Sequence, residues 1–132
     1  ILLVWDEQPG RDGLLAPAGG GVEPGEKPEE AAAREFQEET GYTAGSLSLW
    51  FSHEPSNRTI FTAYFYIGTN IKKIREPSLD PGEKIELRFF TFDEFLMLGQ
   101  NPKLRDSQMR IMLLEAQLDS KKKDTLYQQF YG

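Results

Sequence analysis

The sequence contains no cysteine and a single histidine, His53. The lack of cysteine excludes disulfides, and it excludes zinc and iron–sulfur sites that depend on thiolate ligands. With one histidine, a metal site built on imidazoles and a Ser-His-Asp triad are both disfavoured. Catalysis must therefore rest on carboxylates, arginine, lysine, tyrosine or a bound metal. The absence of thiols is also compatible with a reducing compartment, and we expect a cytoplasmic protein.

Long apolar runs and positive charge are scarce as well. No stretch approaches the roughly 18 apolar residues of a membrane span. The net charge of −6 argues against a nucleic-acid partner, because phosphate backbones need clustered lysine and arginine. The one basic block, Lys121–Lys123, is predicted to be a solvated tail segment. We expect neither a membrane nor nucleic acid as a partner.

The length of 132 residues suits a single domain with one hydrophobic core, which we place over residues 1–132. The chain starts inside the apolar run Ile1–Trp5, without an initiator methionine. We therefore expect an N-terminal segment of the natural protein to precede Ile1.

Residue periodicity predicts strands, one helix, more strands and then more helices. The predicted strands are Ile1–Trp5, Ser46–Phe51 with Leu47, Leu49 and Phe51 on one face, Thr59–Ile67, and a segment marked by Ile85, Leu87 and Phe89. The predicted helices start at Pro28 and stop at Gly41, run over Asp93–Leu98, and follow an Asp106 cap with a stripe of Ile111, Leu114 and Leu118. The order predicts an α+β fold with helices flanking a sheet.

Several other side chains receive plain structural interpretations. Lys72–Lys84 is predicted to be a polar loop, and His53 a surface residue at a strand end. Four aromatic residues are expected to pack in the core rather than to stack on a base: Trp5, Trp50, Phe51 and Tyr64.

The helix after Pro28 carries three glutamates on one face. Glu35, Glu38 and Glu39 are spaced i, i+3 and i+4, so they project together. Three like charges so close repel one another unless a cation lies among them, and carboxylate oxygens suit Mg²⁺ or Mn²⁺. Arg34 is one turn before Glu38 and can hold it. The opposite face, with Ala33, Phe36 and Thr40, is expected to face the core. A solvated acidic helix is the alternative interpretation at this point.

The glycines before this helix and the spacing of its charges extend the pattern. Gly20, Glu26, Arg34-Glu35-Phe36, Glu38-Glu39 and Gly41-Tyr42 occupy nine defined positions within 23 residues. This arrangement resembles the Nudix box at every defined position. The strands on both sides also suit the Nudix fold. The resemblance implies a Nudix-type α/β/α sandwich with a mixed central sheet.

The Nudix resemblance also implies roles for these residues in the hydrolysis of a nucleoside diphosphate derivative. The implied metal ligands are Glu35, Glu38, Glu39 and backbone oxygens at Gly19 and Gly20, with Mg²⁺ as the cofactor and Mn²⁺ as a substitute. Arg34 would orient a glutamate, and Glu26 would support the loop or join an outer metal. The metal would lower the pKa of a bound water, and a carboxylate would accept its proton.

The segment Glu76–Glu86 resembles the acidic loop of ADP-ribose and nucleotide-sugar pyrophosphatases, in which a loop glutamate serves as the base. Glu83 is the first candidate for the base. Glu86 is the second, and it is also a candidate for substrate binding. The catalytic set predicted in this way is Arg34, Glu38, Glu39 and Glu83. Arg58 is predicted to contact a substrate phosphate, with a plain surface arginine as the alternative.

One departure from that subgroup leaves alternatives open. Pro17-Ala18-Gly19-Gly20-Gly21 carries an extra glycine and is closer to the form found in triphosphate-cleaning relatives. The leading expectation is Mg²⁺-dependent cleavage of ADP-ribose or a nucleoside diphosphate sugar into a nucleoside monophosphate and a sugar phosphate. The alternatives are a MutT-like nucleoside triphosphate pyrophosphatase and a non-catalytic Nudix-fold binding module. The subgroup also implies a small nucleotide substrate and a homodimer.

Overall fold

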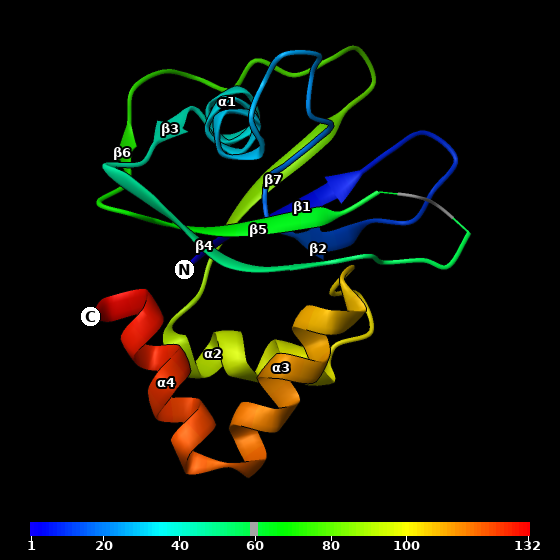
Figure 1. Cartoon of the computed structure of the whole chain (residues 1–132). Helices are drawn as coiled ribbons and strands as arrows, with labels where there is room; N and C mark the ends of the chain where they lie inside the picture. The colour runs from blue at the N-terminus through cyan, green and yellow to red at the C-terminus, as the bar shows by residue number, and fades with distance from the viewer. Residues whose placement is uncertain (59–60) are drawn as a thin grey trace.

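The computed structural model describes residues 1–58 and 61–132. Its helices are α1 (Pro28–Thr40), α2 (Phe92–Met97), the 3₁₀ turn η1 (Leu98–Gln100), α3 (Ser107–Leu118) and α4 (Ser120–Tyr131). Its strands are β1 (Leu2–Glu7), β2 (Leu14–Ala16), β3 (Tyr42–Thr43), β4 (Ser46–His53), β5 (Ala63–Thr69), β6 (Lys72–Lys73) and β7 (Lys84–Phe89). Figure 1 shows α1 on one side of the strands and α2, α3 and α4 on the other.

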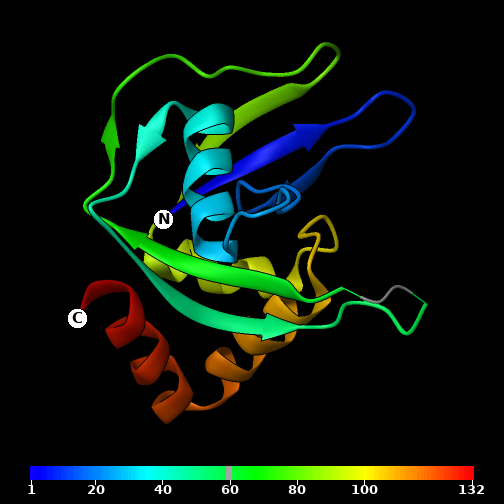
Figure 2. The same cartoon turned by 45° about the horizontal axis from the view of Figure 1, so that its top comes forward.

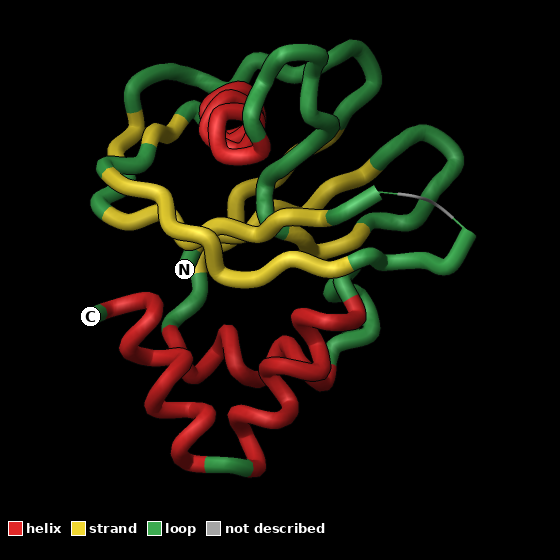
Figure 3. The backbone as a smooth tube through the Cα atoms, in the orientation of Figure 1, coloured by secondary structure: helices red, strands yellow, loops and turns green. Residues whose placement is uncertain are grey.

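The strands form three small groups in the middle layer. β1 lies between β2 and β7, β3 pairs with β6, and β4 pairs with β5. The pairings between these strands are antiparallel. A single parallel bridge joins Leu15 of β2 to Leu104. Helix, strand and helix layers follow one another in Figure 3, so the predicted α+β sandwich is confirmed.

The main core lies between the strand layer and the C-terminal helices. Its most deeply buried members include Phe95, Leu104, Met109 and Leu113. Three of the four aromatic residues predicted to be core, Trp5, Trp50 and Phe51, pack against this cluster. Tyr64 does not follow that prediction, because 45% of it is exposed on β5.

Helix α1 begins and ends where the sequence predicts. Pro28 occupies its first turn, and the Glu30 side chain accepts a hydrogen bond from the Lys27 backbone. Gly41 ends the helix with φ of 76°, and a Cβ there would overlap the Arg75 carbonyl oxygen. The backbone N–H groups of Ile74 and Arg75 both donate to the Gly41 oxygen. This end of α1 is therefore held against the segment that follows β6.

The core-facing side of α1 differs from the prediction at one residue. Thr40 is fully buried, as expected, and Phe36 is half-buried. Ala33 is exposed, and Ala31 is buried in its place. Ala33 is therefore not part of the packed surface of α1, although Thr40, two turns further along, is.

Two predicted strands are shifted in the structure. β4 continues to His53, and a register irregularity between Leu49 and Phe51 leaves Leu49 56% exposed, so strict alternation fails there. β5 covers Ala63–Thr69 instead of Thr59–Ile67. Residues 59 and 60 of that prediction lie outside the described residues. The predicted loop Lys72–Lys84 also contains the two residues of β6.

The predicted apolar stripe of the last helix is wrong. The buried side of α3 consists of Met109, Leu113 and Ala116, which face α2 and η1. Ile111 and Leu118 are 48% and 90% exposed. The spacing of both sets fits a helix, so periodicity alone did not decide which side packs.

The basic block is part of a helix and not a tail. Lys121–Lys123 form the first turn of α4, where Asp119 caps the helix. Lys122 pairs with Glu115 of α3, and Lys123 with Asp93 of α2. Leu126 of α4 is buried against the core. Within the described part of the chain, no helix has the length and apolar character that crossing a membrane requires.

Candidate active site

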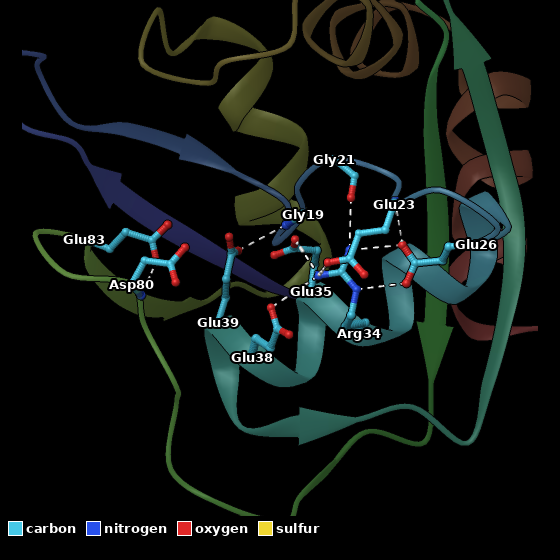
Figure 4. A network of polar contacts seen from close by, with 10 residues as sticks. All are labelled: Gly19, Gly21, Glu23, Glu26, Arg34, Glu35, Glu38, Glu39, Asp80 and Glu83. Carbon is cyan, nitrogen blue, oxygen red and sulfur yellow. Dashed lines mark hydrogen bonds and ion pairs between the residues drawn. The ribbon is translucent and has the colours of Figure 1, made fainter.

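The side of α1 that faces away from the core carries a network of charges, drawn in Figure 4. At its centre is Arg34. Its guanidinium donates to Glu26 Oε2 at 2.8 Å, to Glu35 Oε1 at 2.9 Å and to Glu38 Oε2 at 3.3 Å. It also donates to the Gly21 backbone oxygen at 3.0 Å. One cation thus joins the helix to the glycine-rich loop before it.

The charges of this network shift the pKa values of its members. The hydrogen bond from Arg34 lowers the pKa of Glu26 below its usual range. The same bond, with that to Glu35, raises the pKa of Arg34. Glu26 Oε1 also accepts a hydrogen bond from the Glu23 backbone N–H at 3.0 Å, a contact compatible with the loop-supporting role, which stays a prediction.

Glu39 lies outside the contacts of Arg34 and next to the loop. Its Oε2 accepts a hydrogen bond from the Gly19 N–H at 3.1 Å, and the residue is 9% exposed. Burial, together with the charges of Glu35, Asp6 and Glu83, raises the pKa of Glu39 from 4.5 to about 7, against the lowering effect of the Gly19 hydrogen bond. A carboxylate under this repulsion favours a cation beside it.

Asp6 was not singled out from the sequence, yet it belongs to this site. It is 8% exposed at the end of β1. Burial alone would raise the pKa of Asp6, but hydrogen bonds from Arg105 and Gln8 outweigh burial and lower it. The sequence contained one indication of this position. Asp6 is two residues after the buried Val4, so in a strand both side chains point to the same face.

The loop before β7 brings Glu83 to the same place. The Ser78 N–H donates to the Glu38 backbone oxygen at 2.7 Å, which fixes the loop against the end of α1. Glu83 Oε2 accepts from the Asp80 N–H at 3.0 Å. In Figure 4, Glu83 and Asp80 lie beyond Glu39 along the line of α1.

Glu86 lies elsewhere. It pairs with Trp5 in the β1–β7 register, whereas Ile85 pairs with Asp6. Residues directly opposite in an antiparallel pair share a face, and successive residues alternate. Glu86 therefore points to the face opposite Asp6, where it pairs with Arg88 at 3.5 Å. Of the two predicted bases, the geometry brings Glu83 to the α1 carboxylates.

Of the remaining predicted residues, some lie beside the α1 carboxylates and one does not. Gly20 lies directly against Glu35, because a Cβ on Gly20 would overlap the Glu35 carboxylate. Gly19 contributes its N–H to Glu39. Arg58 is exposed, and its backbone N–H donates to the Ser56 side-chain Oγ at 3.1 Å. The structure thus joins the glycines to the carboxylates but does not bring Arg58 to them.

His53 is more than a surface residue at a strand end. Its Nε2 lies 2.7 Å from Asp106 Oδ2, and its ring lies beside the stacked rings of Phe51 and Phe65. Asp106 also caps α3 through the Met109 N–H. The contact ties the end of β4 to the start of α3, which is a structural role.

The donor set around α1 suits a hard divalent cation. It offers the carboxylates of Glu35, Glu38 and Glu39 next to backbone oxygens of a glycine-rich loop, and oxygen ligands of this kind favour Mg²⁺ and Mn²⁺. The backbone at Gly20 comes close enough to Glu35 to leave no room for a side chain. Among the described residues, no three acidic or histidine side chains converge into a ready cage. Arg34 accounts for this, because it draws Glu35 and Glu38 towards itself.

A cavity of about 750 Å³ lies away from the carboxylates. It extends between the start of β1, the edge of β5 and the end of α4. Among the described residues, Pro17 and Ala18 line it from the glycine-rich loop region, and no described acidic side chain does so. The Trp50 indole N–H, which also lines it, is buried without a hydrogen-bond partner in the described structure. The lining of this cavity thus offers no carboxylate ligand for a metal, in contrast to the outer face of α1.

A family model for the NUDIX domain matches residues 1–113. The chain belongs to the Nudix family. The resemblance stated from the Nudix box is thereby confirmed, and the matched region contains α1, the glycine-rich loop and the Glu83 loop. Helix α4 lies beyond the matched residues. No curated protein sequence matches the chain significantly.

Solved structures share the Nudix fold at low sequence identity. An ADP compounds hydrolase matches with a TM-score of 0.71 and 18% identity, over 91% of this chain and 66% of that one. A MutT structure, from work on Aliivibrio salmonicida and Vibrio cholerae, matches with a TM-score of 0.55 and 20% identity, over 76% of this chain and 72% of that one. The chain thus spans about two thirds of the length of the ADP compounds hydrolase. At these identities the likeness shows the fold alone.

The raised pKa of Glu39 makes the stability of the metal-free protein depend on pH. Below pH 4.5 Glu39 is protonated in both the folded and the unfolded chain, so Glu39 costs the fold no stability there. As the pH rises towards 7, the unfolded chain ionises first and the folded state loses stability. Between these two pH values we expect the free energy of unfolding of Glu39→Gln to rise by roughly 3 kcal/mol relative to that of the wild type. Urea unfolding in EDTA at several pH values measures this gain, and a difference independent of pH would contradict the placement of Glu39.

The contact between Gly20 and Glu35 predicts a local effect on metal binding. Gly20→Ala should displace the Glu35 carboxylate and weaken Mn²⁺ binding by about tenfold or more, as loss of ligand support commonly does. Gly21→Ala is the matched control, because a Cβ there meets nothing within 4 Å. Electron paramagnetic resonance of free Mn²⁺ measures both affinities. Equal Mn²⁺ affinities for the two variants would contradict the assignment of Glu35 as a metal ligand.

Proposed function

We propose that this chain is a Mg²⁺-dependent diphosphatase that cleaves ADP-ribose or a nucleoside diphosphate sugar into a nucleoside monophosphate and a sugar phosphate. The observation that carries the proposal is the Glu83 loop, which is anchored to the end of α1 and brings a second acidic segment beside Glu39. The fold likeness to an ADP compounds hydrolase over 91% of the chain supports the choice. The intact set of box glutamates supports an active enzyme over a silent binding module.

The proposed roles follow from the contacts of each residue. Glu35, Glu38 and Glu39, with backbone oxygens at Gly19 and Gly20, would hold the cation. Mg²⁺ bound there supplies charge neutralisation for the diphosphate and a water of lowered pKa. Arg34 keeps Glu35 and Glu38 oriented from one side of the helix.

Glu83 is the proposed base. The attacking water forms a bond to one phosphorus, the bridging P–O bond breaks, and Glu83 accepts the proton of the water. Its position beside Glu39, on a loop held by the α1 end, supports this role over that of Glu86.

A second candidate function is a nucleoside triphosphate pyrophosphatase. The run Gly19-Gly20-Gly21 favours it, because the extra glycine is closer to the form of triphosphate-cleaning relatives. The fold likeness to MutT supports it too, over a smaller part of the chain than the ADP compounds hydrolase covers. Both candidates use the same carboxylates. They differ in which P–O–P linkage of the substrate lies at these carboxylates for cleavage.

Two further expectations stay predictions. The resemblance to the sugar-diphosphate subgroup favours a homodimer, and the absence of cysteine is compatible with a cytoplasmic location. Sedimentation of the purified chain measures the first of these directly.

A substrate panel tests the proposal. The protein is incubated with Mg²⁺ and ADP-ribose, GDP-mannose, UDP-glucose, dGTP or 8-oxo-dGTP, and the products are identified. A nucleoside monophosphate together with a sugar phosphate is the expected result. Release of pyrophosphate from a triphosphate would establish the second candidate instead. Binding without turnover of any compound would favour the silent module.

The loop geometry predicts unequal effects for its two candidate bases. Glu83→Gln should lower kcat by about 10²–10⁴, the usual contribution of a positioned general base. Glu86→Gln, on the other face of the sheet, should change kcat by less than about threefold and serves as the matched control. Steady-state kinetics on the best substrate of the panel measures both. If Glu86→Gln is the damaging change, the assignment of the base is wrong.

A further inference from the structure

A short segment before α3 runs alongside the strand that leads into the glycine-rich loop. The Leu15 N–H donates to the Lys103 oxygen, and the Arg105 N–H donates to the Leu15 oxygen, both at 2.8 Å. Leu104 is buried in this parallel bridge. Four residues after Leu15, the chain reaches Gly19, whose N–H bonds to Glu39. The backbone of Arg105 is therefore fixed relative to the site.

The side chain of Arg105 lies on the same face of the sheet as the carboxylates. Leu104 shares the core face with Leu15, so the alternation of a strand turns Arg105 to the opposite face. Its Nη2 donates to Asp6 Oδ2 at 2.9 Å, across β2. Asp6 in turn lies close enough to Glu39 for their charges to interact. Arg105, Asp6 and Glu39 thus follow one another along one face.

Arg34 and Arg105 differ in what their guanidiniums contact. Arg34 spreads its donors over Glu26, Glu35, Glu38 and the Gly21 oxygen, and only 25% of its side chain is exposed. Arg105 is 41% exposed, and among the described residues its guanidinium contacts Asp6 through one nitrogen. A guanidinium has five N–H donors, so Arg105 retains donors for an incoming group. Its planar head suits phosphate oxygens.

We propose that Arg105 binds a phosphate oxygen of the substrate diphosphate and that the buried Asp6 is the positioning residue that holds its guanidinium towards the site. This inference rests on the proposed function, because it assigns a contact to the same substrate. It places a cation on the β1–β2 side of a site that is otherwise rich in carboxylates. The substrate class it serves is any compound with a diphosphate, whether linked to a sugar or within a triphosphate.

Binding of inorganic pyrophosphate in the presence of Mg²⁺ tests the contact without turnover. Arg105→Gln keeps an amide donor for Asp6 but removes the charge, and we expect its Kd for pyrophosphate to rise about tenfold or more. Arg105→Lys keeps the charge without the planar fork, and its Kd should fall between those of the wild type and Arg105→Gln. Lys103→Gln is the matched control, since it removes a charge two residues away, and its Kd should change less than twofold. Titration calorimetry measures all four proteins.

Kinetics and thermal unfolding separate a substrate contact from a merely structural ion pair. On a substrate that the wild type cleaves, Arg105→Gln should raise KM about tenfold with kcat within about threefold and with a Tm near that of the wild type. Unchanged pyrophosphate affinity in both Arg105 variants, or no pyrophosphate binding by the wild type, would overturn the inference. If Arg105→Gln lowers the Tm strongly, the pyrophosphate Kd of Arg105→Lys is used instead. A raised Kd then supports the contact, and an unchanged Kd overturns it. A wild type that cleaves no compound of the panel but shows the Arg105 effect on pyrophosphate would refute the proposed function and leave this inference standing.

Discussion

The ion pairs of Arg34 are the interaction on which the rest of the site depends. Its guanidinium pairs with Glu35 and Glu38 of its own helix and with Glu23 and Glu26 of the preceding loop, and it donates to the Gly21 backbone oxygen. Without that cation, the glutamates of α1 and Glu26 would repel one another across a short distance. The loop before α1 and the face of α1 are thereby held as one unit, which Figure 2 shows as a loop folded back beside the helix.

A second constraint acts at the other end of α1. The helix can end at Gly41 and meet the Arg75 carbonyl only because that position has no side chain. The segment after β6 then bonds to Gly41 and, through Ser78, to the Glu38 backbone. Because the segment is held there, Glu83, five residues after Ser78, lies near the end of α1. Two loops far apart in sequence therefore converge on Glu39, the most buried glutamate of the face.

The parts of this arrangement that could be predicted from the sequence are local. Helix α1, its ends at Pro28 and Gly41 and the shared face of its glutamates depend on neighbouring residues, so spacing was sufficient. The packed side of α3 was mispredicted, because its two candidate stripes have the same periodicity and only contacts with α2 and η1 choose between them. Asp6 and Arg105 are 99 residues apart, and no local pattern links them. The choice between Glu83 and Glu86 likewise required the β1–β7 register.

We propose that the carboxylates of α1, held by Arg34 at Glu35 and Glu38 and by the Gly19 N–H at Glu39, form the metal site at which the diphosphate is cleaved. Anomalous scattering from crystals soaked with Mn²⁺ tests this, because it locates the metal without reference to activity. We expect anomalous density bounded by the carboxylates of Glu35 and Glu39 and by the backbone at Gly19 and Gly20. Density elsewhere, or none at Mn²⁺ concentrations that support turnover, would contradict it.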